Sequence, residues 1–243
     1  MGSLAPSKGI KWVLDTDMRM KRLAVQTSLV MSMAWCVLAQ APQPASAPRP
    51  DGLYATFQTS MGTIVAQLFE KETPLTVQNF VGLAKGTKPW LDPRTKAMVR
   101  KPMYNGLIFH RVMLDGMIQS GDPTGTGDGT GGIKLKDEIR ASLKFDQPGR
   151  LAMANTGEPN SGSCQWFITQ ASPIPSYNGS YTIFGQVVEG QDVVKAISRA
   201  PGAVAANNNR PKNPPKLISV TIDRVGPPPA GPPTFQKAAP AKK

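Results

Sequence analysis

Two alternating runs between Tyr54 and Phe69 constrain the fold of this chain more than any other feature. In YATFQTS-MG-TIVAQLF, apolar and polar residues alternate on either side of Met61-Gly62. Alternation of period two with β-branched and aromatic residues predicts strands that have one buried face, and the glycine-containing joint predicts a hairpin. The domain is therefore expected to begin with β-structure.

The elements expected after this hairpin are mostly short strands. They are expected at about 107–113, 117–120, 150–154, 165–170 and 181–187, and in the last run KLISVTIDRV. One helix is expected to begin at Thr73-Pro74 and end at Gly86, and another to cover about 191–199. The first helix should bury Leu75, Phe80, Leu83 and Ala84, and Lys88 to Asn105 is expected to be a long polar loop. Many short strands with two helices favour a mainly β fold, a barrel or sandwich with helical caps.

Proline-rich segments divide the chain. Residues 40–50 (within QAPQPASAPRP) and 226–243 (GPPPAGPPTFQKAAPAKK) lack apolar periodicity, so we expect a linker and a disordered tail there. Residues 51–225 are expected to form one packed domain.

Residues 1–39 have the pattern of an N-terminal extension with an export signal. A basic cluster near Arg22 precedes the apolar stretch Leu23 to Leu38, which is short for a membrane span. Cleavage is expected near Ala39 or Ala41, which predicts a periplasmic or secreted protein. An uncleaved membrane anchor remains the alternative.

The first residues do not resemble a standard signal start. Translation is therefore interpreted as beginning at Met18 or Met20.

Charge and residue counts narrow the possible functions. The net charge is +12, but residues 51–225 hold 19 basic and 14 acidic residues and no basic run interleaved with aromatics, so no nucleic-acid partner is expected. The single histidine, His110, excludes a multi-histidine metal site, and no cofactor or metal is expected. Without the signal, Cys164 is the only cysteine, so no internal disulfide is expected.

The segment 109–132, FHRVMLDGMIQSGDPTGTGDGTGG, holds the most informative polar residues. Arg111 and Gln119 sit in mostly apolar strand-like runs, where an arginine is costly unless it is paired or functional. His110 is interpreted as a core histidine that shares a face with Ile108 and Val112. The glycine-rich run lacks a phosphate-loop motif and is expected to form a flexible rim.

These residues suit one reaction that needs neither proton transfer nor a covalent intermediate. A cationic donor (Arg111), amides (Gln119, Asn155, Gln165) and apolar surface could hold a carbonyl and weaken the amide resonance that opposes rotation before proline. From the residues alone, plain peptide binding is an equally open alternative.

Several ordered motifs give the chain a resemblance to the cyclophilin family of peptidyl-prolyl cis-trans isomerases. They are TPLTVQNFVGLAKG, FHRVMLDGMIQSGDPTGTG, LAMANTGEPNSGSCQWFIT and YTIFGQVVEGQDVVKAI, within about 53–225. The resemblance implies a closed eight-stranded antiparallel β-barrel capped by two α-helices. It implies a monomer that acts on proline-containing unfolded or partly folded polypeptides.

The resemblance also implies a role for each site residue. The catalytic set would be Arg111, Gln119, Met117, Phe167 and Tyr181, with Arg111 on the proline carbonyl. The substrate-binding set would be Ala154, Asn155, Gln165, Gly116 and Tyr177.

Three positions depart from the family pattern. Gly116 replaces a pocket phenylalanine, Tyr181 replaces a pocket histidine, and Tyr177 follows the position of a groove tryptophan. A loss of pocket surface at Gly116 motivates the alternative function, an exported chaperone that binds proline peptides with weak or no turnover.

Overall fold

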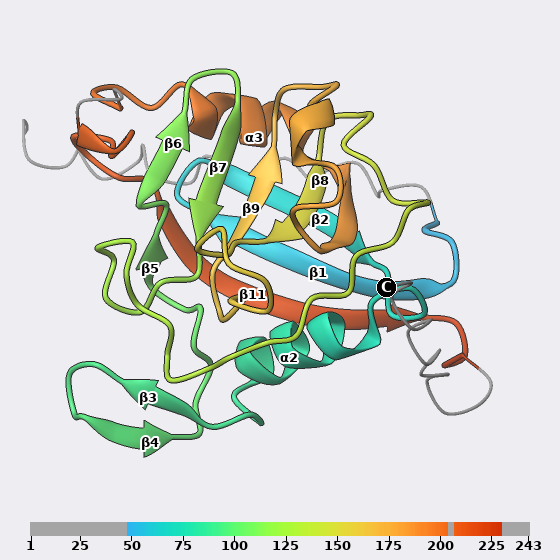
Figure 1. The fold of residues 1–243 in the computed structure, drawn as a ribbon, viewed down its shortest axis with the longest axis horizontal. Coiled ribbons are helices and arrows are strands. Elements are labelled where there is room, and N and C mark those ends of the chain that lie inside the picture. The colour runs from blue at the N-terminus through green and yellow to red at the C-terminus, as the bar shows by residue number, and fades with distance from the viewer. Residues whose placement is uncertain (1–47, 204–206, 230–243) are drawn as a thin grey trace, which may run out of the picture. The chain divides into compact units, whose positions relative to one another are not determined.

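The computed structural model describes residues 48–203 and 207–229 (Figure 1). The predicted signal segment 1–39, most of the linker 40–50 and tail residues 230–243 lie outside the described residues.

Nine strands form one antiparallel sheet in the order β5-β11-β1-β2-β10-β8-β9-β7-β6 (Figure 1). Their bounds are Gly52–Thr59 (β1), Gly62–Leu68 (β2), Leu107–Ile108 (β5), Arg111–Met113 (β6), Met117–Ser120 (β7), Arg150–Met153 (β8), Trp166–Thr169 (β9), Ile183–Glu189 (β10) and Lys216–Val225 (β11). The mainly β prediction is confirmed, and the expected strands lie close to the observed ones, except that 107–113 is two strands.

The sheet is curled but open, which corrects the prediction of a closed eight-stranded barrel. Its two edges, β5 and β6, are neighbours along the chain but do not pair. The chain between them turns toward a later segment, because the Phe109 amide donates to the Pro215 carbonyl (2.9 Å) and the Val112 amide donates to the Asn209 carbonyl (2.8 Å). The first bond continues the antiparallel pairing of Ile108 with Lys216 by one residue, and the second ties β6 to the segment 207–210.

The first hairpin turns one residue earlier than predicted. Thr59 pairs with Gly62, so Ser60 and Met61 form the two-residue turn. The Thr59 hydroxyl donates to the Gly62 carbonyl (2.7 Å) and accepts from the Met61 amide (3.0 Å), which fixes the turn at this place.

The helix α2, Pro74–Lys85, has the predicted ends but a different cap. Gly86 adopts the left-handed conformation at its C-terminus, as expected. At the N-terminus the Thr73 side chain makes no capping bond; instead the buried Glu138 carboxylate accepts the Thr76 amide and hydroxyl, each at 2.8 Å. Leu75 is only partly buried, which corrects its assignment to the core face.

The second helix, α3, covers Gln191–Ser198 and ends one residue before its predicted end. Figure 1 shows α2 along β11, whereas α3 lies beside β6 and β7. The two predicted helices are therefore confirmed in the described residues, together with one short 3₁₀ turn, η1 (Pro175–Tyr177).

The expected polar loop at 88–105 contains a small separate hairpin, which corrects that prediction. Its strands are β3 (Trp90–Asp92) and β4 (Ala97–Val99). The turn is held by Asp92, whose carbonyl accepts the Lys96 amide (2.8 Å) and whose carboxylate accepts the Arg94 amide (2.9 Å). Three-residue strands carry too little alternation to be recognised in a sequence.

Strand β9 separates two apolar clusters, because successive side chains point to opposite faces of a strand. Trp166 and Ile168 lie in the main core. The rings around Trp166 come from Phe57, Phe80, Tyr104 and Phe109. Phe167 points the other way and packs in a second cluster with Met117, Phe145, Ala152 and Ile183. This second cluster is the base of the candidate site.

Candidate active site

A small cavity of about 50 Å³ lies over the second cluster, and every residue that lines it was singled out from the sequence. They are Arg111, Met117, Gln119, Ala154, Asn155, Phe167, Tyr177 and Tyr181. The fold thus brings together eight of the ten site residues, from positions up to 70 residues apart.

The strand register explains how three of them meet. Arg111 on β6 lies opposite Gln119 on β7, which in turn lies opposite Phe167 on β9. Residues directly opposite on antiparallel strands share a face and have neighbouring Cβ atoms. A guanidinium, a carboxamide and an aromatic ring therefore form one row across the sheet.

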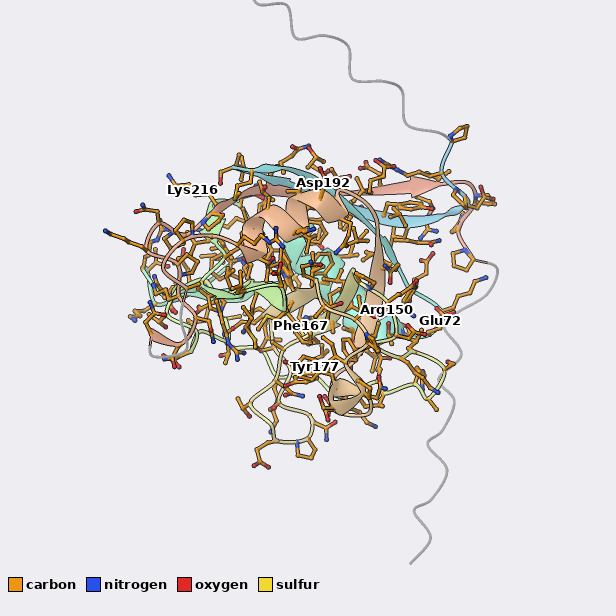
Figure 2. All side chains as sticks on the ribbon, turned by 90° about the horizontal axis from the view of Figure 1, so that it is seen from above. Glu72, Arg150, Phe167, Tyr177, Asp192 and Lys216 are labelled. Carbon is orange, nitrogen blue, oxygen red and sulfur yellow. The ribbon has the colours of Figure 1, made fainter. Side chains whose placement is uncertain are left out.

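Two tyrosines complete the aromatic wall around Phe167. Its ring lies 5.1 Å from that of Tyr181 and 6.0 Å from that of Tyr177, both near perpendicular. Figure 2 shows Tyr177 beside Phe167. Tyr177 belongs to η1, and the loop there is fixed because the Asn178 side chain accepts the Phe145 amide (2.8 Å). Edge-to-face rings of this kind form a firm apolar wall.

A chain of side-chain hydrogen bonds orients the polar half of the site. Arg111 Nη1 donates to Gln119 Oε1 (3.3 Å), and Gln119 Nε2 donates to Gln165 Oε1 (2.9 Å). Gln165 Nε2 then donates to the carbonyls of Gly127 (2.8 Å) and Gly129 (2.9 Å). Gln119 and Gln165 are buried while Arg111 is exposed, so the two amides form a fixed support and the guanidinium faces the solvent.

The glycine-rich segment is held from within by Asp122. Its carboxylate accepts the amide and hydroxyl of Thr124 (2.7 Å each) and the Gly127 amide (2.5 Å). Burial disfavours the charged carboxylate, but these hydrogen bonds outweigh it and lower the pKa of Asp122. The segment is therefore an ordered rim, in contrast to the flexible one expected.

Two predicted site residues lie outside the small cavity. Gln165 lines a second cavity of about 210 Å³ with Ser163, Thr130 and others, next to Ala154 and Asn155. Gly116 lines neither cavity; its carbonyl accepts the amides of Gln170 (2.7 Å) and Ala171 (2.9 Å). Gly116 therefore shapes the turn that leads into Met117.

His110 is buried, as expected of a core histidine, but it lines a cavity rather than packing in the main apolar cluster. The break between β5 and β6 interrupts the alternation, so Phe109 and Val112 enter the main core while His110 lines a third, larger cavity. Residues 207–210, NNNR, form another wall of this cavity. Sequence reasoning missed them, because nothing in a polar run of asparagines indicates which surface it will face.

Other reactive groups have structural surroundings. Burial raises the pKa of the Cys164 thiol to about 12, so this side chain is an unreactive part of the packing. Across residues 48–203 and 207–229, no group of three or more metal-ligating side chains occurs. In the same ranges, no helix has both the length and the apolar character needed to cross a membrane.

A mainly β curled sheet with two helices and an arginine beside an aromatic cavity defines a fold of the cyclophilin type. Residues 54–222 match the family model described as cyclophilin type peptidyl-prolyl cis-trans isomerase/CLD. The chain belongs to this family and is a peptidyl-prolyl cis-trans isomerase.

Curated relatives support this assignment. The chain is 46% identical over 170 residues to peptidyl-prolyl cis-trans isomerase A of Mycobacterium tuberculosis, covering 69% of this chain and 91% of the relative. It is 42% identical over 173 residues to peptidyl-prolyl cis-trans isomerase B of Streptomyces anulatus, covering 71% and 95%.

A solved structure shares the fold. It is the crystal structure of a Cryptosporidium parvum cyclophilin type peptidyl-prolyl cis-trans isomerase in the presence of the dipeptide Ala-Pro. The TM-score is 0.60 at 29% identity, and the match covers 71% of this chain and 99% of that one.

Proposed function

We propose that this isomerase accelerates rotation of Xaa-Pro bonds by electrostatic stabilisation from Arg111 above an apolar proline pocket. The observation that carries the proposal is the row Arg111–Gln119–Phe167, in which a supported guanidinium lies beside an aromatic wall. The proline ring would rest on Phe167 and Met117, with Tyr177 and Tyr181 at its sides.

The chemistry requires only a donor and a pocket. The barrier to rotation, about 18–20 kcal/mol, comes from amide resonance. Arg111 would contact the proline carbonyl and direct an N–H at the prolyl nitrogen, which favours a pyramidal nitrogen and weakens that resonance. Because this contact is strongest in the twisted state, it would lower the barrier.

The substrate backbone would pair with Asn155. The Asn155 side chain is engaged within the loop, since its Nδ2 donates to the Ser180 carbonyl (2.8 Å) and its Oδ1 accepts the Gly157 amide (3.1 Å). The Ala154 amide is bonded to the Gln165 carbonyl (3.0 Å). These bonds hold the backbone of Ala154 and Asn155 beside the cavity, where an extended peptide could add to it.

The substrates would be unfolded or partly folded polypeptides that contain proline, bound by a monomer. Uncatalysed isomerisation takes tens to hundreds of seconds, so catalysis would matter for folding. We further propose that the protein acts in the periplasm or outside the cell. Cell fractionation with N-terminal sequencing of the mature chain tests this: a mature chain that starts at Met1, Met18 or Met20 in the cytoplasm would contradict it.

A protease-free assay on a cis-proline peptide tests the mechanism. We expect Arg111→Ala to lower kcat/KM by about 100-fold or more, as for loss of a major transition-state donor. Arg94→Ala, which removes an exposed arginine from the β3–β4 turn, is the matched control and should keep wild-type activity. An Arg111→Ala variant as active as the wild type would contradict this mechanism.

The second candidate is a chaperone that binds proline peptides with little turnover. Gly116 favours it, because this position supplies no aromatic side chain to the cavity. Peptide affinity with negligible rate enhancement in the same assay would support this candidate, whereas efficient turnover by the wild-type protein would exclude it.

A further inference from the structure

The third cavity, of about 450 Å³, has no role in the proposed mechanism. It shares Arg111, Gln119 and Asn155 with the proline cavity and so continues the same groove. Its other lining residues are His110, Thr126, Gly127, Asp128, Thr156, Asn207, Asn208, Asn209 and Arg210.

The wall at 207–210 is tied to the catalytic strand and to the glycine-rich rim. The Asn209 carbonyl accepts the amide of Val112, the residue after Arg111, at 2.8 Å. The Arg210 guanidinium donates to the Gly125 carbonyl of the rim. Asn208 and Asn209 both have left-handed backbone angles (φ 55° and 57°), a conformation that asparagine tolerates better than most residues. The segment 207–210 is therefore held against both β6 and the glycine-rich rim by hydrogen bonds.

A buried polar side chain faces this cavity without a partner. His110 is 4% exposed, and neither ring nitrogen has a hydrogen bond within the described residues. Burial is the largest effect on the pKa of His110 and lowers it, while the neighbouring Gln165 acts in the opposite direction without reaching hydrogen-bond geometry with the ring. An unsatisfied buried polar group is costly and calls for a ligand or a solvent partner.

The charged groups of the cavity favour an anion. Arg111 and Arg210 contribute two guanidinium groups, against the single carboxylate of Asp128. For the His110 ring, burial lowers the pKa, Asp122 raises it, and Arg210 and Arg111 lower it, so the ring adds no positive charge of its own at pH 7. Guanidinium forks suit a carboxylate particularly well.

The direction of the peptide follows from Arg111. The proline carbonyl is on the C-terminal side of the ring, so a peptide whose carbonyl contacts Arg111 continues past that residue. The third cavity includes Arg111, whereas the second cavity, beside Gln165, does not. Residues after the proline should therefore enter the third cavity, and residues before it should pass toward the second.

We propose that the cavity formed by His110, Arg111 and Arg210 binds the carboxylate of an aspartate or glutamate one or two residues after the proline. The site thus selects acidic sequences on the C-terminal side of the isomerised bond. This inference rests on the proposed function, because the direction of the peptide depends on the role of Arg111.

Matched peptides test the selectivity. Two series place Asp, Asn or Lys at the first or the second position after proline, and both kcat/KM and the dissociation constant are measured. In at least one of the two series, we expect kcat/KM and affinity to be about three- to tenfold higher for the Asp peptide than for the Asn peptide, and lowest for the Lys peptide. These differences should shrink as the salt concentration rises. Equal values for Asp, Asn and Lys at both positions would overturn the proposal.

A charge reversal locates the effect. Arg210→Glu should abolish or invert the preference for Asp over Lys, while Arg210→Lys should retain most of it. Lys71→Glu changes the net charge equally at an exposed position that lines none of the three cavities, and should keep both the preference and the activity. An unchanged preference in Arg210→Glu, or an equal loss in Lys71→Glu, contradicts the assignment.

The single histidine offers a direct readout of occupancy. The ring signal of His110 in the proton NMR spectrum is unambiguous because the chain has no other histidine. We expect Asp peptides, but not Lys peptides, to raise the pKa of His110 on binding. A bound Asp peptide that leaves this signal unmoved would also refute the proposal.

These experiments separate the two proposals. Loss of turnover with retained preference in affinity would overturn the mechanism and keep the acidic site. Efficient turnover without preference would overturn the acidic site alone.

Discussion

Arg111 Nη1 donates to Gln119 Oε1 across the β6–β7 pair at 3.3 Å, and the two residues lie directly opposite in register. Gln119 donates in turn to Gln165, and Gln165 donates to two carbonyls of the glycine-rich rim. Among the described residues, Arg111 is the only charged side chain that lines the small cavity, and it is oriented by a buried amide rather than by a carboxylate. A carboxylate would form an ion pair with the guanidinium and compete with the substrate for it.

Removing that support should slow catalysis while leaving the fold intact. For Gln119→Leu we expect kcat/KM to fall about tenfold, mainly through kcat, because the guanidinium loses its fixed orientation. The same assay on Gln58→Leu, an exposed glutamine of β1, serves as the control. Unchanged kcat in Gln119→Leu would show that the hydrogen bond does not contribute.

Adding a side chain at Gly116 should change the isomerase activity little. A Cβ atom there would meet Met113 Cβ at 3.0 Å, and the backbone is not left-handed, so a side chain needs only a small shift. Since Phe167, Tyr177 and Tyr181 already line the cavity, we expect the kcat/KM of Gly116→Phe to stay within about threefold of the wild-type value. Such a change is smaller than the tenfold change that corresponds to about 1.4 kcal/mol. Gly116→Ala controls for the backbone change. A tenfold gain from the phenylalanine would instead support the weakly active chaperone.

Tyr177 should contribute to substrate binding through its ring. Tyr177→Ala removes an edge-to-face partner of Phe167 and opens the cavity, so we expect the dissociation constant for a proline peptide to rise about three- to tenfold. Tyr177→Phe keeps the ring and should bind like the wild type. Calorimetry on both variants distinguishes the ring from the hydroxyl, and equal losses in both would contradict this reading.

Glu138 should stabilise the fold without contributing to catalysis. Its buried carboxylate caps α2 through the Thr76 amide and hydroxyl, so we expect Glu138→Ala to lower the free energy of unfolding by about 2–3 kcal/mol. Urea denaturation measures this, with the exposed Glu158→Ala as a control that should cost less than about 0.5 kcal/mol. Equal costs in the two variants would show that the cap is not stabilising.

Stability should fall with acid in two steps. The folded pKa of Asp122 is lowered, so its contribution is present above the unfolded pKa of about 3.9 and is lost as pH falls below it. The folded pKa of His110 is also lowered, because the folded protein disfavours the charged ring. The folded protein therefore loses stability relative to the unfolded chain as pH falls below the unfolded pKa of about 6.5.

The two steps can be assigned by substitution. Thermal unfolding against pH should show the lower step reduced in Asp122→Asn and the upper step retained. A lower step that persists unchanged in Asp122→Asn would assign it to other carboxylates.

Local pattern was enough to predict much of the site. The alternation in β7 and β9 places Met117 and Gln119 on one face and turns Trp166 away from Phe167. Thr73-Pro74 and Gly86 marked the ends of α2 correctly. The roles of the site residues came from resemblance to a family, and periodicity alone left peptide binding equally open.

Features that depend on distant contacts could not be read from the chain. Glu138 caps a helix 62 residues away, which no local signal near Thr76 indicates. The bonds from Phe109 and Val112 to residues 215 and 209 join the segment around His110 to a part of the chain about 100 residues later. The sequence by itself determined which residues alternate and where the helices end, because those depend on backbone geometry within a few residues. Only the tertiary structure decided which strands end the sheet and that NNNR lines a cavity with Arg111, because the backbone groups of that segment find their partners about 100 residues away.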